Sequence, residues 1–507
     1  MSESSKKESA FSQLGLAKTV KAICDEIREL YLWDQIPWVI GYSGGKDSTA
    51  IVQLIWLALR ELPEQSRKKP VHIITTDTLV EQPVVAAWVD ASHAKMQTAA
   101  IEQNMPITPH KLTPDSKDSF WVNLIGRGYP APRKLFRWCT SRMKINPSNN
   151  FIRNVVRENG EAILVLGTRK AESQRRALDM AEKAKKKVRD RLTPNAALPN
   201  SLVYTPIEDW TNDDVWLFLM QVKNPWGYNN KSLLGMYQGA SADGECPLVV
   251  DTSTPSCGNS RFGCWVCTVV DKDRSMEAMI KNDEEKVWMT PLLELRNDLG
   301  DFEKEPLRRD YRRMSGRVQL FHDGIVRGPY TKVAREYWLR RVLEVQQQVR
   351  RVGPEEFRQI NLVTVPELHE IRRIWLYEKH EFDDSLPVIY EKAVGESFPV
   401  MPSDDNLLRA DDWQLLREVC GEDDEFFQLQ AALLDVEREF RGMSRRAGIY
   451  DALEDRLRAG QYASEEEAIS IRKTEERRRA DAEQVEQPEP HLLQRVLFHN
   501  DASVEDE

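Results

Sequence analysis

Two hydrophobic patterns alternate along residues 15–235. Apolar side chains recur at helical spacing over residues 16–32, 49–62 and 84–102. Between and after these segments stand short apolar runs without regular polar alternation, which are typical of strands buried on both faces of a sheet. Strands separated by helices form parallel sheets, so the pattern predicts an α/β fold with a doubly wound parallel sheet. The four strand runs are residues 38–42, 71–77, 162–167 and 202–206.

The remaining regions differ from this one in character. Residues 1–14 are polar, and we expect them to be loose. Residues 236–400 begin with a stretch rich in Gly, Pro, Ser and Thr and continue with helical patterns. Residues 401–507 are acidic and helical in pattern, and their almost wholly charged stretch at residues 465–483 favours a solvated helix or a partner-facing tail. The sequence therefore predicts four regions, with the α/β domain at residues 15–235.

Three local features refine this division. Residues 174–200, between the last two strand runs, are too long for an ordinary connection and predict a projecting basic helix or a mobile loop. Residues 317–326 predict a hairpin that turns at Asp323 and Gly324. Residues 330–352 have the spacing of an amphipathic helix.

The composition excludes two classes of protein. Hydrophobic residues make up 41% and charged residues 30% of the chain, as in soluble globular proteins. The longest apolar stretch, residues 50–59, is far shorter than the ~20 residues that cross a bilayer. The first residues carry charges without an apolar segment behind them, unlike a secretory signal. We therefore expect a cytoplasmic protein whose seven cysteines serve as ligands or reactive groups rather than as disulfides.

Charge is distributed unevenly along the chain, whose formal net charge is −10. Residues 131–191 hold 17 Lys and Arg against 6 Asp and Glu, whereas residues 401–507 hold 14 against 28. A basic band of this kind suits a phosphate-rich ligand or a nucleic acid, and it suits a solvated helix at least as well. Composition alone does not decide between these interpretations.

The first strand run is followed by Ser43-Gly-Gly-Lys-Asp-Ser48 and then by a helix. Two glycines here let the backbone approach phosphates, and the first N–H groups of the helix point at them. The Walker A pattern fails, because Ile40 stands where its first glycine belongs and Asp47 follows Lys46. The dinucleotide pattern G-x-G-x-x-G fails as well. The six residues resemble instead the signature of the PP-loop ATP pyrophosphatases, whose loop holds the pyrophosphate of ATP while the α-phosphate is attacked.

Three later segments resemble the phosphoadenylylsulfate reductase branch of that superfamily. Asp77 and Glu81 follow the second strand run, residues 167–176 follow the third, and residues 206–216 follow the fourth. All lie at or just beyond the carboxyl ends of expected strands, where open α/β sheets bind ligands. We expect the two tryptophans of the last segment to pack in the core and Arg169 to contact phosphate.

The resemblance implies a nucleotide site. ATP is the expected cofactor, with Mg²⁺ on its pyrophosphate and Asp47 or Asp77 as a ligand of the metal. Lys46 and Asp47 are expected to act in catalysis. The expected ATP-binding residues are Ser43, Gly44, Gly45, Lys46, Asp47, Ser48, Asp77, Gly167 and Arg169.

Four of the seven cysteines are clustered in a loop-rich segment: Cys246, Cys257, Cys264 and Cys267. Four thiolates suit either tetrahedral zinc or a cubane iron–sulfur cluster. The spacing alone favours zinc. The resemblance implies a [4Fe-4S] cluster, because the sulfate-reductase branch couples its PP-loop to one.

Cys139 lies in the basic band, where neighbouring cations are expected to lower the pKa of the thiol and favour thiolate. Its segment resembles an element in which many sulfate-reductase relatives carry a cluster-binding Cys-Cys pair, whereas here Thr140 follows Cys139. Five thiols therefore compete for four cluster positions. We interpret Cys139 as a catalytic sulfur carrier, with cluster ligation as the alternative, and Cys24 and Cys420 as structural.

Several members of the superfamily fit in part. A free-standing phosphoadenylylsulfate reductase has no use for the basic insert or the acidic tail, and a sulfate adenylyltransferase subunit does not need four clustered cysteines. A tRNA thiolase is not expected to carry the whole motif set. The combination over about residues 40–345 most closely resembles the DndC family, the sulfurtransferase component of bacterial DNA phosphorothioation.

That resemblance implies an activity and partners. ATP would adenylate a DNA backbone phosphate with release of pyrophosphate, and sulfur from a cysteine desulfurase would then displace AMP. DNA, the desulfurase and other subunits of a phosphorothioation complex are the expected partners. A rival interpretation is a non-catalytic iron–sulfur subunit for DNA binding or assembly, against which the intact glycine motif argues. The cations expected to neutralise DNA phosphates are Lys185, Lys186, Lys187 and Arg189.

Overall fold

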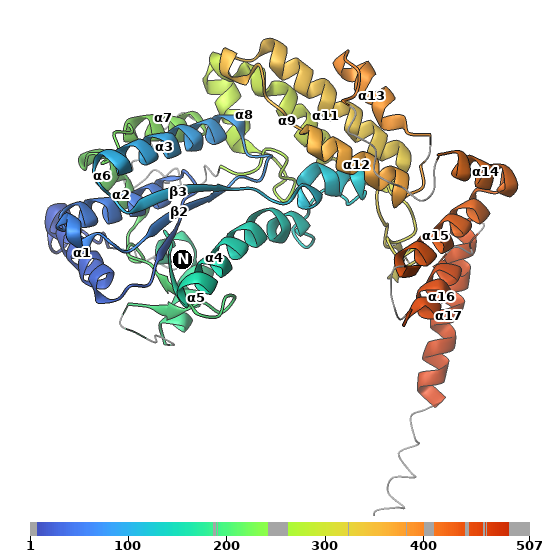
Figure 1. The fold of residues 1–507 in the computed structure, drawn as a ribbon, viewed down its shortest axis with the longest axis horizontal. Helices are drawn as coiled ribbons and strands as arrows, with labels where there is room; N and C mark the ends of the chain where they lie inside the picture. Colours follow the sequence, from blue (N-terminus) through green and yellow to red (C-terminus); the bar gives the residue numbers. More distant parts are fainter. Residues whose placement is uncertain are drawn as a thin grey trace, which may run out of the picture.

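A six-stranded sheet forms the centre of the amino-terminal half (Figure 1). The computed structural model describes residues 8–185, 189, 191–241, 262–322, 324–381, 383–399, 410–441, 446–459, 462 and 464–485. The strand order is β3-β2-β1-β4-β6-β5, parallel except for β5, which pairs antiparallel with β6. The strands are β1 Trp38–Gly41, β2 Val71–Thr76, β3 Ile107–Leu112, β4 Ala162–Val165, β5 Thr193–Pro194 and β6 Ser201–Tyr204.

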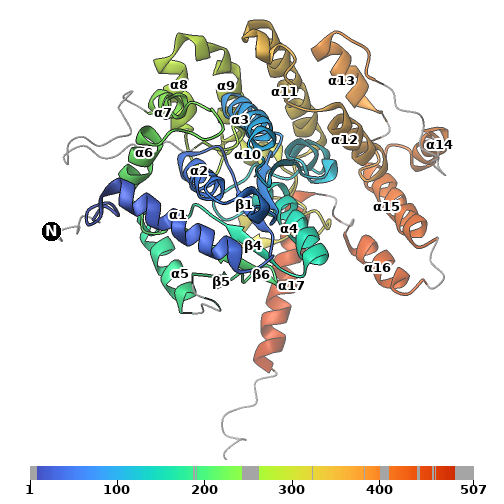
Figure 2. The same cartoon turned by 60° about the vertical axis from the view of Figure 1, so that its left-hand side comes forward.

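Helices cover both faces of this sheet, as the sequence predicts (Figures 1 and 2). One face packs on α1, α2, α3, α6 and α7, and the other on α4. The fold is therefore a doubly wound α/β fold. The bounds are α1 Gly15–Trp33, α2 Lys46–Arg60, α3 Pro83–Glu102, α4 Asn146–Asn159, α5 Gln174–Ala184, α6 Asn212–Gln221 and α7 Asn230–Gly239.

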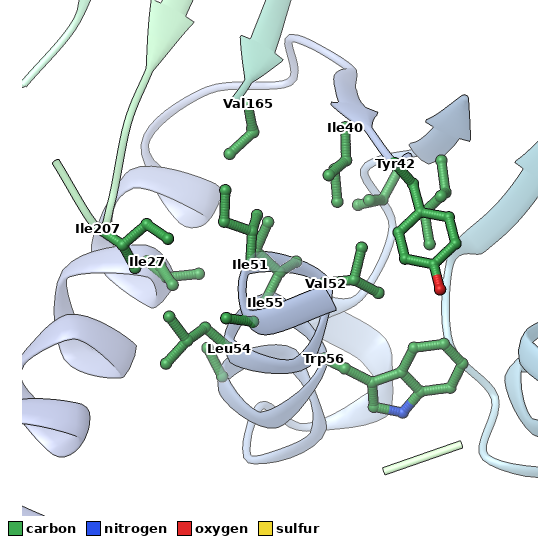
Figure 3. Close-up of a cluster of buried hydrophobic side chains, with 14 of the residues drawn as sticks. Ile27, Ile40, Tyr42, Ile51, Val52, Leu54, Ile55, Trp56, Val165 and Ile207 are labelled. Atoms are coloured by element: carbon green, nitrogen blue, oxygen red, sulfur yellow. The ribbon is translucent and has the colours of Figure 1, made fainter. Parts of the chain in front are cut away.

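Helix α2 is the centre of the larger core. Its side chains from Thr49 to Trp56 are almost completely buried, because the sheet lies on one side and other helices lie on the other. Figure 3 shows Ile51, Leu54 and Ile55 surrounded by side chains from α1, β1 and β4. This packing fixes the start of α2, and with it the glycine motif, relative to the sheet.

The parallel register places the carboxyl ends of the strands at one edge of the sheet. Trp38 of β1 aligns with Val71 of β2 and with Ile163 of β4, and Ala162 of β4 aligns with Ser201 of β6. We call the edge at which β1, β2, β4 and β6 end the carboxyl edge. All motifs that follow the strands in sequence therefore lie along this edge.

Two strands of the central sheet, β3 and the short β5, are absent from the sequence prediction. β3 lies at the edge of the sheet, beside β2. Its sequence contains Pro109, and its side chains are only partly buried after Ile107. A proline is tolerated in an edge strand because one side of that strand has no neighbour to receive an N–H group. Half-burial and proline together hide this strand from a search for continuous apolar runs.

Residues 262–399 form a helical region with its own hydrophobic core. This core also takes in residues 120–143, including a π-helical turn, η3 Val122–Gly126. Trp121 donates its indole N–H to the carbonyl of Leu362 at 2.6 Å, and Trp375 donates to the carbonyl of Ile125 at 3.0 Å. The helices are α8 Arg274–Asn282, α9 Thr290–Leu299, α10 Glu305–Arg308, α11 Lys332–Val352, α12 Val365–Tyr377 and α13 Ser385–Val394.

The hairpin and the long amphipathic helix of the sequence prediction are present. β7 Leu320–Phe321 pairs antiparallel with β8 Gly324–Ile325, and α11 follows seven residues later. The insert at 174–200, predicted as a projecting basic helix or a mobile loop, includes α5 and the edge strand β5 among its described residues. Beyond residue 409 the described chain is helical. The boundaries of the four regions, at residues 14/15, 235/236 and 400/401, stay a prediction. The helices are α14 Ala410–Cys420, α15 Asp424–Arg441, α16 Ile449–Ala459 and α17 Glu465–Val485.

The described helices include none that is long and apolar enough to cross a membrane. Cys24 and Cys420 are buried, as their structural interpretation requires. The short helical turns are 3₁₀ elements η1 Glu64–Ser66, η2 Ser116–Asp118, η5 Lys170–Glu172, η6 Glu284–Met289 and η7 Glu355–Phe357, and the π element η4 Thr140–Ile145.

Candidate active site

The glycine motif forms a tight turn between β1 and α2. Residues 43–48 make up this turn and the start of the helix, and we call them the glycine loop. The hydroxyl of Ser48 donates to the carbonyl of Gly45 at 3.0 Å and accepts from the backbone N–H of Ser43 at 3.2 Å. The first N–H groups of α2 thereby face the carboxyl edge, where an anion would be stabilised by them and by the helix dipole.

Gly44 and Gly45 are required by their surroundings. Gly44 has φ of +74°, and a Cβ there would lie 2.5 Å from a methyl of Val89. Its carbonyl accepts a hydrogen bond from the indole of Trp88 at 3.1 Å. A Cβ on Gly45 would lie 3.2 Å from the hydroxyl of Tyr237. Both glycines therefore allow a close approach of the loop to α3 and α7.

Three predicted site residues meet at the start of α2. Asp47 pairs with Lys46 at 3.0 Å and with Arg169 at 2.7 Å. Arg169 is buried and also donates to the carbonyl of Trp210 at 3.2 Å, so its guanidinium is fixed in place. A Cβ on Gly167 would lie 3.1 Å from the backbone carbon of Asp47, so glycine is needed where the segment after β4 passes α2. The structure thus brings the two motifs together.

The phosphate contact of Arg169 stays a prediction. In the structure its guanidinium holds the carboxylate of Asp47 and a backbone carbonyl. It also lines the cavity described below. Trp210 and Trp216 are buried in the core, as expected.

A cavity of about 920 Å³ lies along the carboxyl edge of the sheet. The glycine loop forms one wall, and Asp77, Lys111, Arg176 and Tyr237 contribute charged and polar groups to the others. The cavity extends as far as Glu81 and Lys144. It is large enough for a nucleotide together with part of a second substrate.

Asp77 lies at the end of β2, as predicted, and is already paired. Its carboxylate accepts from the backbone N–H of Leu79 at 2.8 Å and contacts the amino group of Lys111 at 3.0 Å. Lys111 belongs to β3, the strand that the sequence pattern did not indicate, and it also pairs with Asp90. A metal ion at Asp77 would therefore have to compete with Lys111 for the carboxylate.

The far end of the cavity adjoins Cys264. Glu81 accepts a hydrogen bond from Thr78 at 2.9 Å and contacts the thiol of Cys264 at 3.7 Å. Lys144 of η4 lies 3.4 Å from Glu81 and also hydrogen-bonds Cys264. The backbone N–H of Trp265 donates to the carbonyl of Val80 at 3.0 Å, which fastens the cysteine segment to the turn after β2.

Cys264 and Cys267 form a tight turn beside Cys139. The N–H of Cys267 donates to the carbonyl of Cys264 at 3.0 Å. Cys139 lies close enough to Cys267 for the charge of one thiolate to affect the other. Arg296, a buried side chain of α9, donates to the carbonyls of Cys267 at 3.0 Å and Asp271 at 2.9 Å, and also to that of Val270. This guanidinium clamps the loop that follows the cysteine turn.

The electrostatic expectation for Cys139 was wrong. Burial, and next the proximity of Cys267, raise the pKa of the Cys139 thiol above its ordinary value. Most of the cations near it in sequence point toward other groups, since Arg133 pairs with Glu305 and Arg142 with Asp118. Hydrogen bonds with Thr140 and with the backbone of Cys139 lower the pKa of this thiol, and Lys144 lowers it less than they do. The metal-free site therefore holds a thiol rather than a thiolate at neutral pH.

The pKa values of Cys264 and Lys144, at the far end of the cavity, are both raised. Burial, followed by the carboxylate of Glu81, raises the pKa of Cys264 to about 12. Burial lowers the pKa of Lys144, but Cys264 and Glu81 outweigh burial, and the pKa of the amino group is raised. A positive charge is thus kept between the cavity and the cysteine turn.

A bound cluster or zinc ion needs more ligands than the described residues bring together. Among them, no group of three or more His, Cys, Asp and Glu side chains is arranged to hold a metal ion. Cys246 and Cys257 lie outside the described residues. Cys264 and Cys267 have the soft donors and the tight turn that both metals use, so this half of the predicted ligand set fits either one.

Two of the predicted DNA-contacting residues, Lys185 and Arg189, are described by the structure, and neither lines the cavity. Arg189 pairs with Asp34, which precedes β1, and with Glu161, which precedes β4. Both carboxylates are at the amino edge of the sheet, opposite the glycine loop. Lys185 is exposed and pairs with Glu182. Lys186 and Lys187 are outside the described residues.

The sequence prediction did not assign several residues that line the cavity, among them Lys111, Lys144, Arg176 and Tyr237. The hydroxyl of Tyr237 accepts from the backbone N–H of Lys46 at 3.4 Å, although the two residues are 191 positions apart. Arg176 ends the motif that follows the third strand run, so that motif was a signal for it. Lys144 is one of the cations of the basic band near Cys139 in sequence, and it was not assigned to the site.

Comparison with known proteins agrees with the nucleotide-binding half of this site. Residues 37–269 match the family model described as the phosphoadenosine phosphosulfate reductase domain, which supports a PP-loop domain over this part of the chain. An uncharacterized protein of Methanocaldococcus jannaschii is 24% identical over 262 residues, which are 52% of this chain and 42% of that protein. The aligned part thus spans less than half of the length of that curated relative.

Solved structures show a more distant likeness. FMN adenylyltransferase of Candida glabrata, in complex with FMN and an ATP analogue, is 13% identical, with a TM-score of 0.24 over 40% of this chain and 57% of that one. Yeast FAD synthetase in complex with FAD is 11% identical, with a TM-score of 0.25 over 45% of this chain and 65% of that one.

Proposed function

We propose that this chain is the ATP-using sulfurtransferase subunit of a DNA phosphorothioation system. The observation that carries the proposal is a single cavity that runs from the glycine loop to the Lys144–Glu81 pair, which contacts Cys264. A nucleotide site whose far end adjoins a thiol suits a reaction in which a phosphate is activated and then attacked by sulfur. The family match over residues 37–269 supports the nucleotide half of this pairing.

The proposed reaction consists of two displacements at phosphorus. A non-bridging oxygen of a DNA phosphate attacks the α-phosphorus of ATP, and the bond to pyrophosphate breaks with its electron pair on the leaving oxygen. A sulfur nucleophile, supplied as persulfide sulfur by a cysteine desulfurase, then attacks the adenylated DNA phosphorus. AMP leaves with the original oxygen, so that sulfur replaces it in the DNA. A thiol must reduce the persulfide bond for each atom of sulfur transferred.

The residues of the glycine loop have defined roles in this reaction. The first N–H groups of α2 and the amino group of Lys46 would hold the pyrophosphate portion of ATP. Arg169 would orient Asp47, since it already holds that carboxylate at 2.7 Å. Carboxylate oxygens suit Mg²⁺, and the ion would neutralise charge on the departing pyrophosphate. Asp47 and Asp77 are the carboxylates that would bind the ion. Each would have to give up part of its contact with a lysine, Lys46 for Asp47 and Lys111 for Asp77.

The thiol half has two arrangements. In the first, Cys246, Cys257, Cys264 and Cys267 hold a [4Fe-4S] cluster, and Cys139 receives sulfur. In the second, Cys139 is itself a ligand, which its proximity to Cys267 supports. A cluster would supply electron transfer or a sulfur-binding iron, whereas zinc would supply neither. Iron, sulfide and zinc analysis of anaerobically purified Cys139→Ser and Cys267→Ser proteins separates these arrangements: a carrier leaves the iron content unchanged, and a ligand lowers it.

Pyrophosphate release by the purified chain tests the nucleotide half. Lys46→Ala should reduce release by about 10²-fold or more, because it removes a cation from the phosphate site. Lys18→Ala, an exposed lysine of α1, is the matched control and should have no effect. Equal release from Lys46→Ala and the unmodified chain would contradict the proposal. Mass spectrometry of digested DNA, from cells that express the complete system, then tests for the phosphorothioate itself.

A second candidate is a reductase that acts on a sulfonucleotide, and the family model supports it by its description. The two functions differ in their products. A reductase releases sulfite from a sulfonucleotide without using ATP, whereas the proposed enzyme releases pyrophosphate from ATP. A tRNA-thiolating enzyme would in turn leave its sulfur in RNA, and a non-catalytic subunit would release no pyrophosphate. Assays of sulfite, of pyrophosphate and of sulfur in RNA and DNA therefore separate these alternatives.

A further inference from the structure

An exposed tip precedes Cys139. Residues 134–137, with the sequence Lys-Leu-Phe-Arg, form this tip, and all four side chains are exposed. Leu135 is fully exposed, and Phe136 is 45% exposed. Two adjacent apolar side chains in this state lose the free energy that burial would give them. The tip therefore has the composition of a contact surface, with cations at both ends and apolar groups between them.

The tip is held rigidly although its side chains are exposed. Arg133 and Phe136 exchange two backbone hydrogen bonds of 3.0 and 2.9 Å, which close the turn. Arg133 pairs with the buried carboxylate of Glu305 and lies over the ring of Phe302. The carbonyl of Pro132 accepts from the hydroxyl of Thr268 at 2.7 Å. The turn is thus anchored on one side to α10 and on the other to the segment that follows Cys267.

The charge of the tip is positive and uncompensated within the described part of the chain. Neither Lys134 nor Arg137 has a carboxylate partner among the described residues, whereas Arg133 is neutralised by Glu305. The guanidinium of Arg137 donates to the carbonyl of Lys134 at 3.2 Å, which keeps both cations on the same turn. A polyanion is the partner that complements two such charges.

The tip is also close to the proposed chemistry along the chain. The buried ring of Trp138 follows it directly, and its N–H donates to the carbonyl of Pro130 at 3.0 Å. Cys139 comes next, and then η4, whose Lys144 lines the cavity. A polymer held at the tip would therefore be near the thiol site. Arg189, in contrast, lies at the opposite edge of the sheet and is paired with two carboxylates.

We infer that the tip at residues 134–137 is the surface that engages duplex DNA for the reaction. Lys134 and Arg137 contact phosphates on the two sides of the turn, and Leu135 and Phe136 insert against exposed base edges or between base steps. Apolar wedges of Leu and Phe flanked by cations act in this way in proteins that open or bend DNA. The inference deepens the proposed function and rests on it, because it assigns a place on the molecule to the DNA substrate.

Equilibrium binding to a fluorescent DNA duplex of 25 base pairs tests the inference, with the full chain at several salt concentrations. The double variant Lys134→Ala/Arg137→Ala should bind more weakly, and the slope of log affinity against log salt should fall by ~0.9 for each DNA phosphate that is no longer neutralised. The double variant Leu135→Ser/Phe136→Ser should bind about tenfold more weakly with an unchanged slope, because it removes apolar contacts only. Melting temperatures measured in parallel show whether each variant is folded.

Two matched controls are available on other surfaces. Lys18→Ala/Lys21→Ala removes two exposed cations from α1, and Leu415→Ser removes an exposed leucine from α14. Both should bind DNA as the unmodified chain does. Equal loss of affinity in the Lys18/Lys21 variant would mean that net charge alone is responsible, and it would overturn the inference.

The outcomes separate this inference from the proposed function. If the unmodified chain does not bind DNA, the proposed substrate is wrong, and the inference fails with it. If the unmodified chain binds DNA and both tip variants bind equally well, only the inference fails. If the tip variants keep DNA affinity but no longer bind the cysteine desulfurase, the tip is a protein-docking surface, and the DNA assignment is overturned. Selective loss in the two tip variants supports it.

Discussion

At the residue scale, the candidate site depends on two glycine positions, Gly44 and Gly167, where a larger residue would clash with its neighbours. Gly44 adopts a left-handed backbone, and a Cβ there would overlap the side chain of Val89. Gly167 brings the chain after β4 against the backbone of Asp47. These two close approaches set the distance between the glycine loop, α3 and the Arg169 segment. A substitution at either glycine would therefore disturb the glycine loop more than it would disturb the sheet.

Gly44→Ala tests this dependence. The alanine backbone would have to keep φ of +74°, and its methyl group would lie 2.5 Å from a methyl of Val89. We therefore expect the free energy of unfolding to fall by about 2–3 kcal/mol. Nucleotide binding should be lost as well. Gly235→Ala is the control, because Gly235 lies within α7 with no atom near the new Cβ, and it should be neutral or slightly stabilising. Urea denaturation and ATP titration measure both effects, and equal stability of the two variants would contradict this account.

At the element scale, the cysteine turn is positioned by helices that are distant in sequence. Arg296 of α9 donates to three carbonyls of the loop at 267–271. The turn after β2 fixes the other end, through the bond from Trp265 to Val80. A planar guanidinium can serve several carbonyls at once, and a lysine amino group cannot reproduce that geometry. The helical region therefore holds the thiols against the cavity of the α/β region.

Arg296→Gln should loosen this loop. It leaves at least two partly buried carbonyls without their donor, so we expect a loss of about 1–3 kcal/mol in the free energy of unfolding. Alkylation of Cys267 in the metal-free protein should become faster, because the loop opens more often. Arg340→Gln, on the exposed side of α11, is the control. Urea denaturation and mass spectrometry of the alkylated protein check both effects, and a Cys267 that reacts no faster than in the control would show that Arg296 does not hold the loop.

At the scale of the whole molecule, the two halves share a core. Residues 120–143 come before the last strands of the sheet in sequence, yet they pack within the helical region. Trp121 and Trp375 each donate a hydrogen bond across this contact. The C-terminal helices contact the rest through pairs such as Arg317–Asp455 and Arg327–Glu465. The exposed pair Arg317–Asp455 adds little stability, whereas Trp121 and Trp375 of the shared core are buried.

Trp121→Ala should damage this link. Trp121 is completely buried, and its removal leaves a cavity, so we expect a loss of about 3–5 kcal/mol in the free energy of unfolding. Proteolysis should then cut first between the sheet and the helical region. Trp33→Ala, at a tryptophan of α1 that is 74% exposed, is the control and should change stability little. The two variants can be compared by thermal denaturation and timed digestion, and equal behaviour would mean that the shared core does not couple the two parts.

The sequence by itself determined the features that are local. The glycine loop, the alternation of strands and helices, the hairpin and α11 all follow from spacing and from residue types within short windows. The ends of the strands were also predictable, and they place Asp77 and Arg169 on one edge because parallel strands all end there. The fold class and the nucleotide half of the site follow from these facts.

Only the tertiary structure decided the features that join distant segments. The contacts of Tyr237 with Lys46 and of Glu81 with Cys264 depend on how the sheet and the helical region pack, and so does the electrostatic effect of Cys267 on Cys139. The expected protonation of Cys139 was wrong for the same reason. Burial and the directions of neighbouring side chains set the pKa of a thiol, and the sequence shows only which residues are near along the chain. β3 was not predicted because an edge strand is stabilised by pairing with its neighbour, here β2, and does not need a continuous apolar sequence of its own.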